Sequence, residues 1–274
     1  MRTGSQAIKT FFITLVKRFA DDQCAANAAS LAYTTLLSIV PLLLFVFYVL
    51  SFFPQLQHAD QPLEQFILNH FVASSANVIS SALQSFLANM GVLSWTNVIS
   101  LAAISLVLIF NIVSAINTVW HVQVQKYWAL SFIVYCIFVL IAPILLAILL
   151  MITSYVTSLP MLATVLHIDL VKKPLFYFLP MITEWVAFSF FHWVMPSTHV
   201  QVRFALIAGL LTTILFELAK FGFVQYLHYF PTYQMLYGAL ATIPIFLVWI
   251  YLSWLIVILG ALVCNLLQMQ NNHL

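Results

Sequence analysis

The hydrophobic positions of this chain form long continuous runs instead of alternating with polar positions. A helix needs about 20 apolar residues to cross a bilayer. Runs of that length predict six spans, at about 30–53, 95–119, 130–157, 175–195, 203–228 and 237–266. A membrane barrel would show shorter segments of alternating polarity. The pattern therefore predicts an all-α, polytopic membrane protein whose six transmembrane helices form a single domain, 1–274.

The stretch before the first span, 1–27, has an amphipathic pattern of its own. Its apolar residues recur at helical spacing, at Ile8, Phe11, Phe12, Leu15 and Phe19. Lys9, Lys17 and Arg18 add positive charge to the same stretch. This combination is typical of a helix that lies in the membrane interface. The alternative is a frayed cytoplasmic tail, which the phenylalanines disfavour.

The connection at 54–94 is the longest between predicted spans. An apolar stripe with i, i+3, i+4 spacing runs through 78–87, and a shorter one runs through 63–71. We expect two amphipathic helices at the extracytoplasmic surface. Packing over the bundle is the favoured interpretation, and a lid or a partner-docking segment is the alternative.

Composition supports a membrane protein and argues against a nucleic-acid partner. The chain is 64% hydrophobic and 6% charged, whereas about a quarter of the residues of a soluble domain are charged. The net charge of +2 is too small and too scattered for nucleic-acid binding. The expected partners are membrane lipids, with envelope proteins as further candidates. The sequence does not specify an oligomeric state.

Lysine and arginine residues fall mainly on one side of the predicted spans. That side holds Arg2, Lys9, Lys17, Arg18, Lys126 and Arg203, and the opposite side holds Lys172 and Lys173. Because cytoplasmic loops carry an excess of basic residues, both termini are predicted to be cytoplasmic. Lys172 and Lys173 argue mildly against this orientation.

Three charged residues lie inside membrane-length apolar segments: Glu184, Glu217 and Lys220. A charge at bilayer depth costs a few kcal/mol or more, so it is usually paired inside the bundle or part of a transport pathway. The i, i+3 spacing of Glu217 and Lys220 allows an ion pair within one helix. Glu184 has no cation one turn away and needs a partner from another helix, for which Lys220 is the candidate. A purely structural pair is slightly favoured over a transport role.

Other polar residues of the spans cluster by face. Gly209, Thr213, Glu217, Lys220 and His228 fall within about a 100° arc at 100° per residue, which should face the bundle interior or a wet cavity. On the second predicted span, Asn111 shares a face with Ser114 and Thr118, and Asn117 is nearby. Interhelical hydrogen bonding is favoured over substrate coordination for these residues. The candidates for a substrate or proton pathway are Glu184, Glu217, Lys220, Thr213, Asn111 and Asn117.

The chain offers little support for catalysis. Its three cysteines form no CxxC motif, and its eight histidines form no HxxxH or HExxH motif. A nucleophile with a nearby base is also missing from the pattern. We therefore expect no enzyme activity, no metal site and no cofactor. His192 is interpreted as an interfacial histidine and not as part of a proton relay.

Several segments resemble the YihY/BrkB family of bacterial inner-membrane proteins. They are 28–42 (AASLAYTTLLSIVPL), 114–120 (SAINTVW), 215–220 (LFELAK), 230–234 (FPTYQ), 237–244 (YGALATIP) and 259–261 (LGA). The resemblance covers nearly the whole chain and implies a six-span bundle in the cytoplasmic membrane. Family members were once labelled ribonuclease BN, a label regarded as mistaken, and are otherwise described as candidate transporters or envelope factors. Where the family commonly has Gly-Ala-Glu near the end of the last span, this chain has Gly260-Ala261-Leu262.

These observations favour a protein that moves or positions an amphipathic, lipid-like envelope substrate. In that hypothesis Glu217 and Lys220 hold a polar site, and Glu184 is the group that takes up and releases a proton. The alternative is a scaffold that organises the envelope without transport, in which the charged residues only hold the bundle together.

Overall fold

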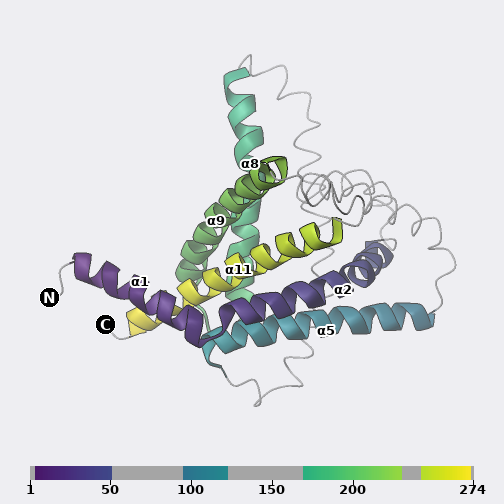
Figure 1. Cartoon of the computed structure of the whole chain (residues 1–274), viewed down its shortest axis with the longest axis horizontal. Coiled ribbons are helices and arrows are strands. Elements are labelled where there is room, and N and C mark those ends of the chain that lie inside the picture. The colour runs from purple at the N-terminus through teal and green to yellow at the C-terminus, as the bar shows by residue number, and fades with distance from the viewer. Residues whose placement is uncertain (1–3, 51–94, 123–168, 230–241, 273–274) are drawn as a thin grey trace.

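A computed structural model describes residues 4–50, 95–122, 169–229 and 242–272, and all regular structure in these ranges is α-helical. The helices are α1 (Gly4–Asp21), α2 (Cys24–Leu50), α5 (Trp95–Trp120), α8 (Asp169–Val194), α9 (Val202–Tyr229) and α11 (Thr242–Asn272), as Figure 1 shows. The all-α prediction is therefore confirmed for the described part of the chain.

Three of the described helices are long and apolar enough to cross a membrane: Ile99–Trp120, Val202–Tyr229 and Ile243–Asn271. They correspond to the spans predicted at 95–119, 203–228 and 237–266. The spans predicted at 30–53 and 175–195 overlap α2 and α8. The span predicted at 130–157 and the amphipathic segments of 54–94 lie outside the described residues. The six-span topology thus stays a prediction.

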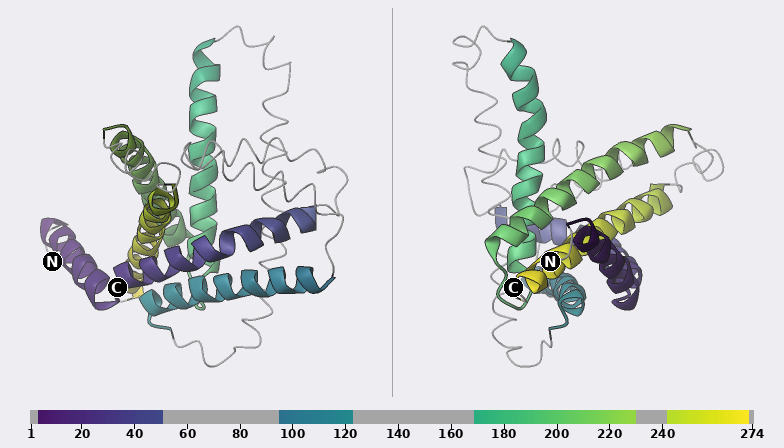
Figure 2. Two further views of the ribbon diagram at one scale, coloured as in Figure 1. Left: turned by 45° about the vertical axis from the view of Figure 1, so that its right-hand side comes forward. Right: turned by 90° about the vertical axis from the view of Figure 1, so that its left-hand side faces the viewer.

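Six helix ends meet in one region, which we call the junction. It contains the end of α1, the start of α2, the end of α5, the end of α8, the start of α9 and the end of α11 (Figures 1 and 2). From the junction the long helices spread outward. Since α5 and α8 both end there, they have the polarity that one additional span between them would produce.

Helix α11 is the centre of the packing, because it contacts each of the other described helices. Its residues 256–266 are almost all buried. Leu262 is fully buried beside Cys24, Ala28 and Leu31. Position 262, where the family resemblance implies an acid, is therefore filled by an apolar contact between α11 and α2.

Small residues set the close approach of α8, α9 and α11. A Cβ added at Gly209 of α9 would overlap Ser189 of α8 and come within 2.7 Å of its backbone nitrogen. Ala205, one turn before Gly209, is buried in the same region. The small-xxx-small spacing of α9 thus serves helix packing, as expected from membrane helices.

The N-terminal helix has two apolar faces. Phe11, Leu15 and Phe19 pack against the core formed by α2, α5 and α11, whereas Phe12 and Val16 point outward. The helix ends at Asp21, and Gln23 adopts a left-handed φ of 50° before α2 begins. The stretch predicted as one interfacial segment over 1–27 is therefore divided between α1 and the first turn of α2.

Candidate functional site

The three charged residues predicted inside the spans meet in space, and we call them the Lys220 cluster. Lys220 Nζ donates to Glu184 Oε1 of α8 at 2.8 Å and to Glu217 Oε1 of α9 at 2.7 Å. Both predicted pairings are confirmed: the contact within α9 at i, i+3 and the contact between helices. A single ammonium group therefore bridges two carboxylates on the neighbouring helices α8 and α9.

The three side chains of the cluster differ in how far they are exposed to solvent. The side chain of Glu184 is 11% exposed, that of Lys220 24%, and that of Glu217 38%. Glu217 is thus the member that a solute or a lipid head group can reach most easily. With both acids ionised, two carboxylates and one ammonium leave one net negative charge, which suits a proton or a cationic group.

One aromatic ring, that of Phe216, lies against the cluster. Lys220 Nζ lies 5.6 Å from the ring centre of Phe216, a distance at which a cation and an aromatic face attract each other. Phe216 in turn contacts Phe188 of α8 and Trp249 of α11, with centroids 5.4 and 5.6 Å away. Phe216 therefore links the ammonium group of Lys220 to aromatic rings of α8 and α11.

The other predicted pathway residues do not join this cluster through any contact described. Thr213 is fully buried and its hydroxyl donates to the Gly209 carbonyl of its own helix at 2.9 Å. Thr118 likewise donates to the Ser114 carbonyl one turn back. Asn111 is half-buried on α5. The polar stripe of α9 is therefore buried at Gly209 and Thr213 and becomes accessible only towards Glu217.

Asn117 makes an interhelical contact, but at the junction. Its Nδ2 donates to Ser197 Oγ at 2.8 Å, and its Oδ1 accepts from the Ser197 backbone nitrogen at 2.8 Å. The same connection between α8 and α9 is held by Gln268 of α11, which donates to the His199 carbonyl and accepts from the Gln201 nitrogen. Asn117 thus positions a loop, and its contacts favour the structural interpretation.

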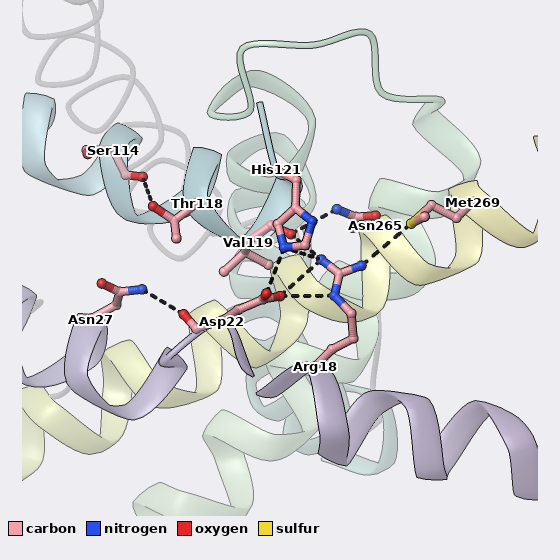
Figure 3. A network of polar contacts seen from close by, with 9 residues as sticks. All are labelled: Arg18, Asp22, Asn27, Ser114, Thr118, Val119, His121, Asn265 and Met269. Carbon is pink, nitrogen blue, oxygen red and sulfur yellow. Dashed lines mark hydrogen bonds and ion pairs between the residues drawn. The ribbon is translucent and has the colours of Figure 1, made fainter. Parts of the chain in front are cut away.

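A second ionic network, shown in Figure 3, lies at the junction and was not predicted. Asp22, whose side chain is 5% exposed, accepts from Arg18 Nε at 3.0 Å and contacts His121 Nε2 at 2.7 Å. Arg18 also donates to the Val119 carbonyl at 2.8 Å, which receives a second hydrogen bond from Asn265 at 3.0 Å. The network joins α1, α5 and α11 through four polar side chains.

The sequence pattern did not reveal this network, because two adjacent acids just before an apolar run, here Asp21 and Asp22, are typical of the start of a helix. The available signal was the i, i+4 spacing of Arg18 and Asp22, which suits an ion pair. The position of His121 depends on its left-handed φ of 52° just after α5, and that backbone turn leaves no clear mark in the pattern.

His192 is a buried residue of the helix interface rather than a surface one. It is 1% exposed, and its Nε2 lies 2.9 Å from Thr212 Oγ1. Because the Thr212 hydroxyl donates to the Ala208 carbonyl at 2.8 Å, the imidazole is the donor in the contact with Thr212. The histidine therefore links α8 to α9 beside Gly260.

Fold and site together define a membrane protein that is helical throughout its described ranges and has a charged cluster between two of its helices. The chain belongs to the BrkB family: the family model described as Virulence factor BrkB matches residues 15–273. A UPF0761 membrane protein of Coxiella burnetii (strain Dugway 5J108-111) is 39% identical over 253 residues, covering 92% of this chain and 91% of that protein. One of Vibrio vulnificus (strain YJ016) is 39% identical over 257 residues, covering 94% and 82%.

A more distant relative is a UPF0761 membrane protein of Legionella pneumophila (strain Corby). It is 34% identical over 267 residues, which cover 95% of this chain and 62% of that protein. No solved structure matches the chain. The relatives thus establish a membrane protein and its family, and their names specify no substrate.

Proposed function

We propose that this protein translocates an amphipathic, lipid-like substrate across or within the bacterial inner membrane, with both termini in the cytoplasm and no enzymatic step. The observation that carries the proposal is the Lys220 cluster. It places three charges between α8, which overlaps a predicted span, and the candidate span α9, and charge at bilayer depth is costly and rare outside paired sites and transport pathways.

The partial exposure of the cluster favours a role in binding a polar head group over a purely structural role. The side chain of Glu217 retains 38% exposure although it is paired, so part of it is accessible from outside the bundle. With both acids ionised, the Lys220 cluster has one surplus negative charge. Either a proton or a cationic group can neutralise that charge, so the two can exchange at the cluster. Proton coupling in this proposal uses Glu184, which is the most enclosed of the three residues.

The proposal is tested by reconstituting the full chain into liposomes that contain a fluorescent lipid and following its transfer between leaflets. The wild-type protein should accelerate transfer, and Glu217→Gln should slow it about tenfold at an equal protein-to-lipid ratio. The matched control is Glu64→Gln, an acid of the predicted outer loop. Transfer at the rate of protein-free liposomes would contradict translocation of that lipid.

Proton coupling has its own test. The transfer rate of the wild-type chain should change with an imposed pH gradient, and Glu184→Gln should remove that dependence. A rate that does not depend on pH and survives Glu184→Gln would remove proton coupling but leave translocation standing.

The second candidate is a scaffold without transport, and one observation favours it. Lys220 binds both carboxylates at once, so the cluster can hold α8 to α9 without any ligand. In a strain lacking the gene, Glu217→Gln at matched membrane levels should fail to restore the envelope barrier if the charge serves transport. Full restoration would favour the scaffold.

A further inference from the structure

Helix α1 has an apolar face that no other described helix covers, and we call it the outer face of α1. Its side chains are those of Phe12, which is 59% exposed, Ile13, also 59%, and Val16, 69%. At 100° per residue the three lie within an arc of about 100°. The arc that packs against the core, from Phe11 to Phe19, lies beside it and is distinct from it.

Contacts on the inner side of α1 fix the direction in which the outer face points. Arg18 donates from Nε to Asp22 at 3.0 Å and from Nη2 to the Val119 carbonyl at 2.8 Å, and its Nη1 contacts Met269 Sδ at 3.6 Å. Helix α1 thus crosses the C-terminal end of α11 (Figure 1). Because the ends of a membrane-length helix lie close to the membrane surface, α1 is held at the depth of the interface.

The charges of α1 that remain available are mainly positive. Its charged residues are Lys9, Lys17, Arg18 and Asp21. Arg18 is paired with the buried Asp22, so two exposed lysines face one exposed acid. Both lysines lie one turn from Ile13 of the outer face. A lysine stem can lie along apolar surface while its ammonium group reaches a phosphate.

We propose that the outer face of α1 binds the surface of a membrane that contains anionic phospholipids. Phe12, Ile13 and Val16 enter the boundary between head groups and acyl chains, and Lys9 and Lys17 contact the phosphates. The interfacial position expected from the sequence leaves open which face meets the membrane and which lipid it selects. The exposure and the charge of α1 supply both, and neither depends on the proposed transport.

A lipid surface suits the outer face better than a second copy of the chain does. A stable protein–protein interface uses about 20–30 residues on each side, whereas this face presents three large apolar side chains. Three such side chains beside two lysines are the composition of a helix that lies in the membrane interface.

The test uses the full chain in liposomes that contain equal amounts of a phosphatidylglycerol and a phosphatidylcholine. Its three cysteines are replaced by alanine, and a fluorescent dye is attached to Val16→Cys. Bromine atoms on the acyl chains of one lipid or the other quench the dye when that lipid is close. Around the dye, phosphatidylglycerol should exceed phosphatidylcholine by about fivefold, the effect of one lysine contact with an anionic surface.

Matched variants separate the charge from the position of the face. Lys9→Gln with Lys17→Gln should bring the two brominated lipids to equal quenching. Lys9→Arg with Lys17→Arg retains both charges and should keep the preference. A dye at Thr10→Cys, which is exposed about 120° around the helix from Val16, should be quenched more strongly by acrylamide in the water than a dye at Val16→Cys.

The dye at Val16→Cys in the chain with both lysines decides the outcome, whether or not the lysine variants fold. Quenching by acrylamide and by neither brominated lipid would place the outer face in water and overturn the proposal. Protection from all three quenchers would also overturn it, because a second copy or another protein would then cover the face. Equal quenching by the two brominated lipids would reject the preference for an anionic lipid.

Discussion

The hydroxyl of Thr212 on α9 lies directly against Gly260 on α11, with no room for a side chain between the two helices. A Cβ at Gly260 would overlap Thr212 Oγ1 and come within 2.7 Å of His192 Nε2. The contact joins three helices at one point, since His192 belongs to α8 and already bonds to Thr212.

Gly260→Ala is therefore expected to destabilise the protein by about 1–3 kcal/mol, the usual range for overpacking a core. Thermal unfolding in detergent measures the effect. Gly222→Ala is the matched control, because a Cβ at Gly222 of α9 meets nothing within 4 Å. That control should be neutral or stabilising by up to about 1 kcal/mol. Equal losses in both variants would show that close packing is not the cause.

Removing the side chain of Asn117 should release the connection between α8 and α9. Asn117→Ala leaves the Ser197 backbone nitrogen without its acceptor, at a cost of about 1–3 kcal/mol. Ser197→Ala keeps that bond and loses the part-buried contact between the Ser197 hydroxyl and Asn117 Nδ2; because Ser197 itself is exposed, water can replace its hydroxyl, so its effect should be smaller. Proteolysis at 196–201 and thermal unfolding test the order of the two variants. A larger loss in Ser197→Ala would contradict the proposed role of Asn117.

Asp22→Asn should be the more damaging of two substitutions in the junction network. It removes the charge partner of Arg18, whose side chain is only 15% exposed, and the loss of one partner of a buried pair costs about 3–5 kcal/mol. His121→Ala removes a contact whose histidine is 61% exposed, and should cost about 1 kcal/mol or less. Chemical unfolding of both variants at one pH gives the comparison, and similar losses would argue that Arg18 is satisfied by the Val119 carbonyl alone.

Cys24, which precedes the predicted first span, should resist thiol reagents at neutral pH. Burial, with a further contribution from nearby Asp22, raises the pKa of the Cys24 thiol to about 11. Because the thiolate is the reactive form, labelling stays slow until the pH approaches that pKa. With Cys136 and Cys264 replaced by serine, maleimide labelling of Cys24 is compared with Lys17→Cys in a Cys24→Ser chain, where the introduced thiol is exposed. Equal labelling at pH 7 would place Cys24 outside the core.

Lys220→Met should destabilise the protein more than Glu217→Gln does. The first change leaves two carboxylates close together without their shared cation, whereas the second keeps the bond between Lys220 and Glu184. We expect losses of about 2 kcal/mol and under 1 kcal/mol respectively. Adding Glu184→Gln to Lys220→Met should recover part of the loss. No recovery would mean that repulsion between the acids is not the cause.

The sequence predicted the helices more completely than it predicted the charged cluster. The apolar runs at 95–119 and 203–228 predicted the bounds of α5 and α9 to within one residue. A continuous apolar run of that length is typical of a membrane-spanning helix and of few other structures. The pairing of Glu217 with Lys220 followed from helical spacing alone. Their meeting with Glu184 was only a candidate, because it depends on how α8 crosses α9 at Gly209.

The junction network shows where prediction from the pattern fails. Asp22 lies in a turn of two residues, and its partners come from residues 18 and 121. The second partner is 99 positions away, and only the meeting of helix ends brings it near. Periodicity describes the inside of helices well and describes their ends poorly.

The central place of α11 has a consequence for how the chain is made. This helix contacts each of the other described helices, yet it is the last of them to leave the ribosome. Helices α2, α5, α8 and α9 are therefore synthesised before their common partner exists, with faces such as that of Leu31 still uncovered. A chain stopped before 242 would keep the contacts of α2 with α5 and of α8 with α9 but lose the helix that joins these two pairs, and the cell would be left with two half-assembled pairs whose uncovered faces quality-control proteases can recognise.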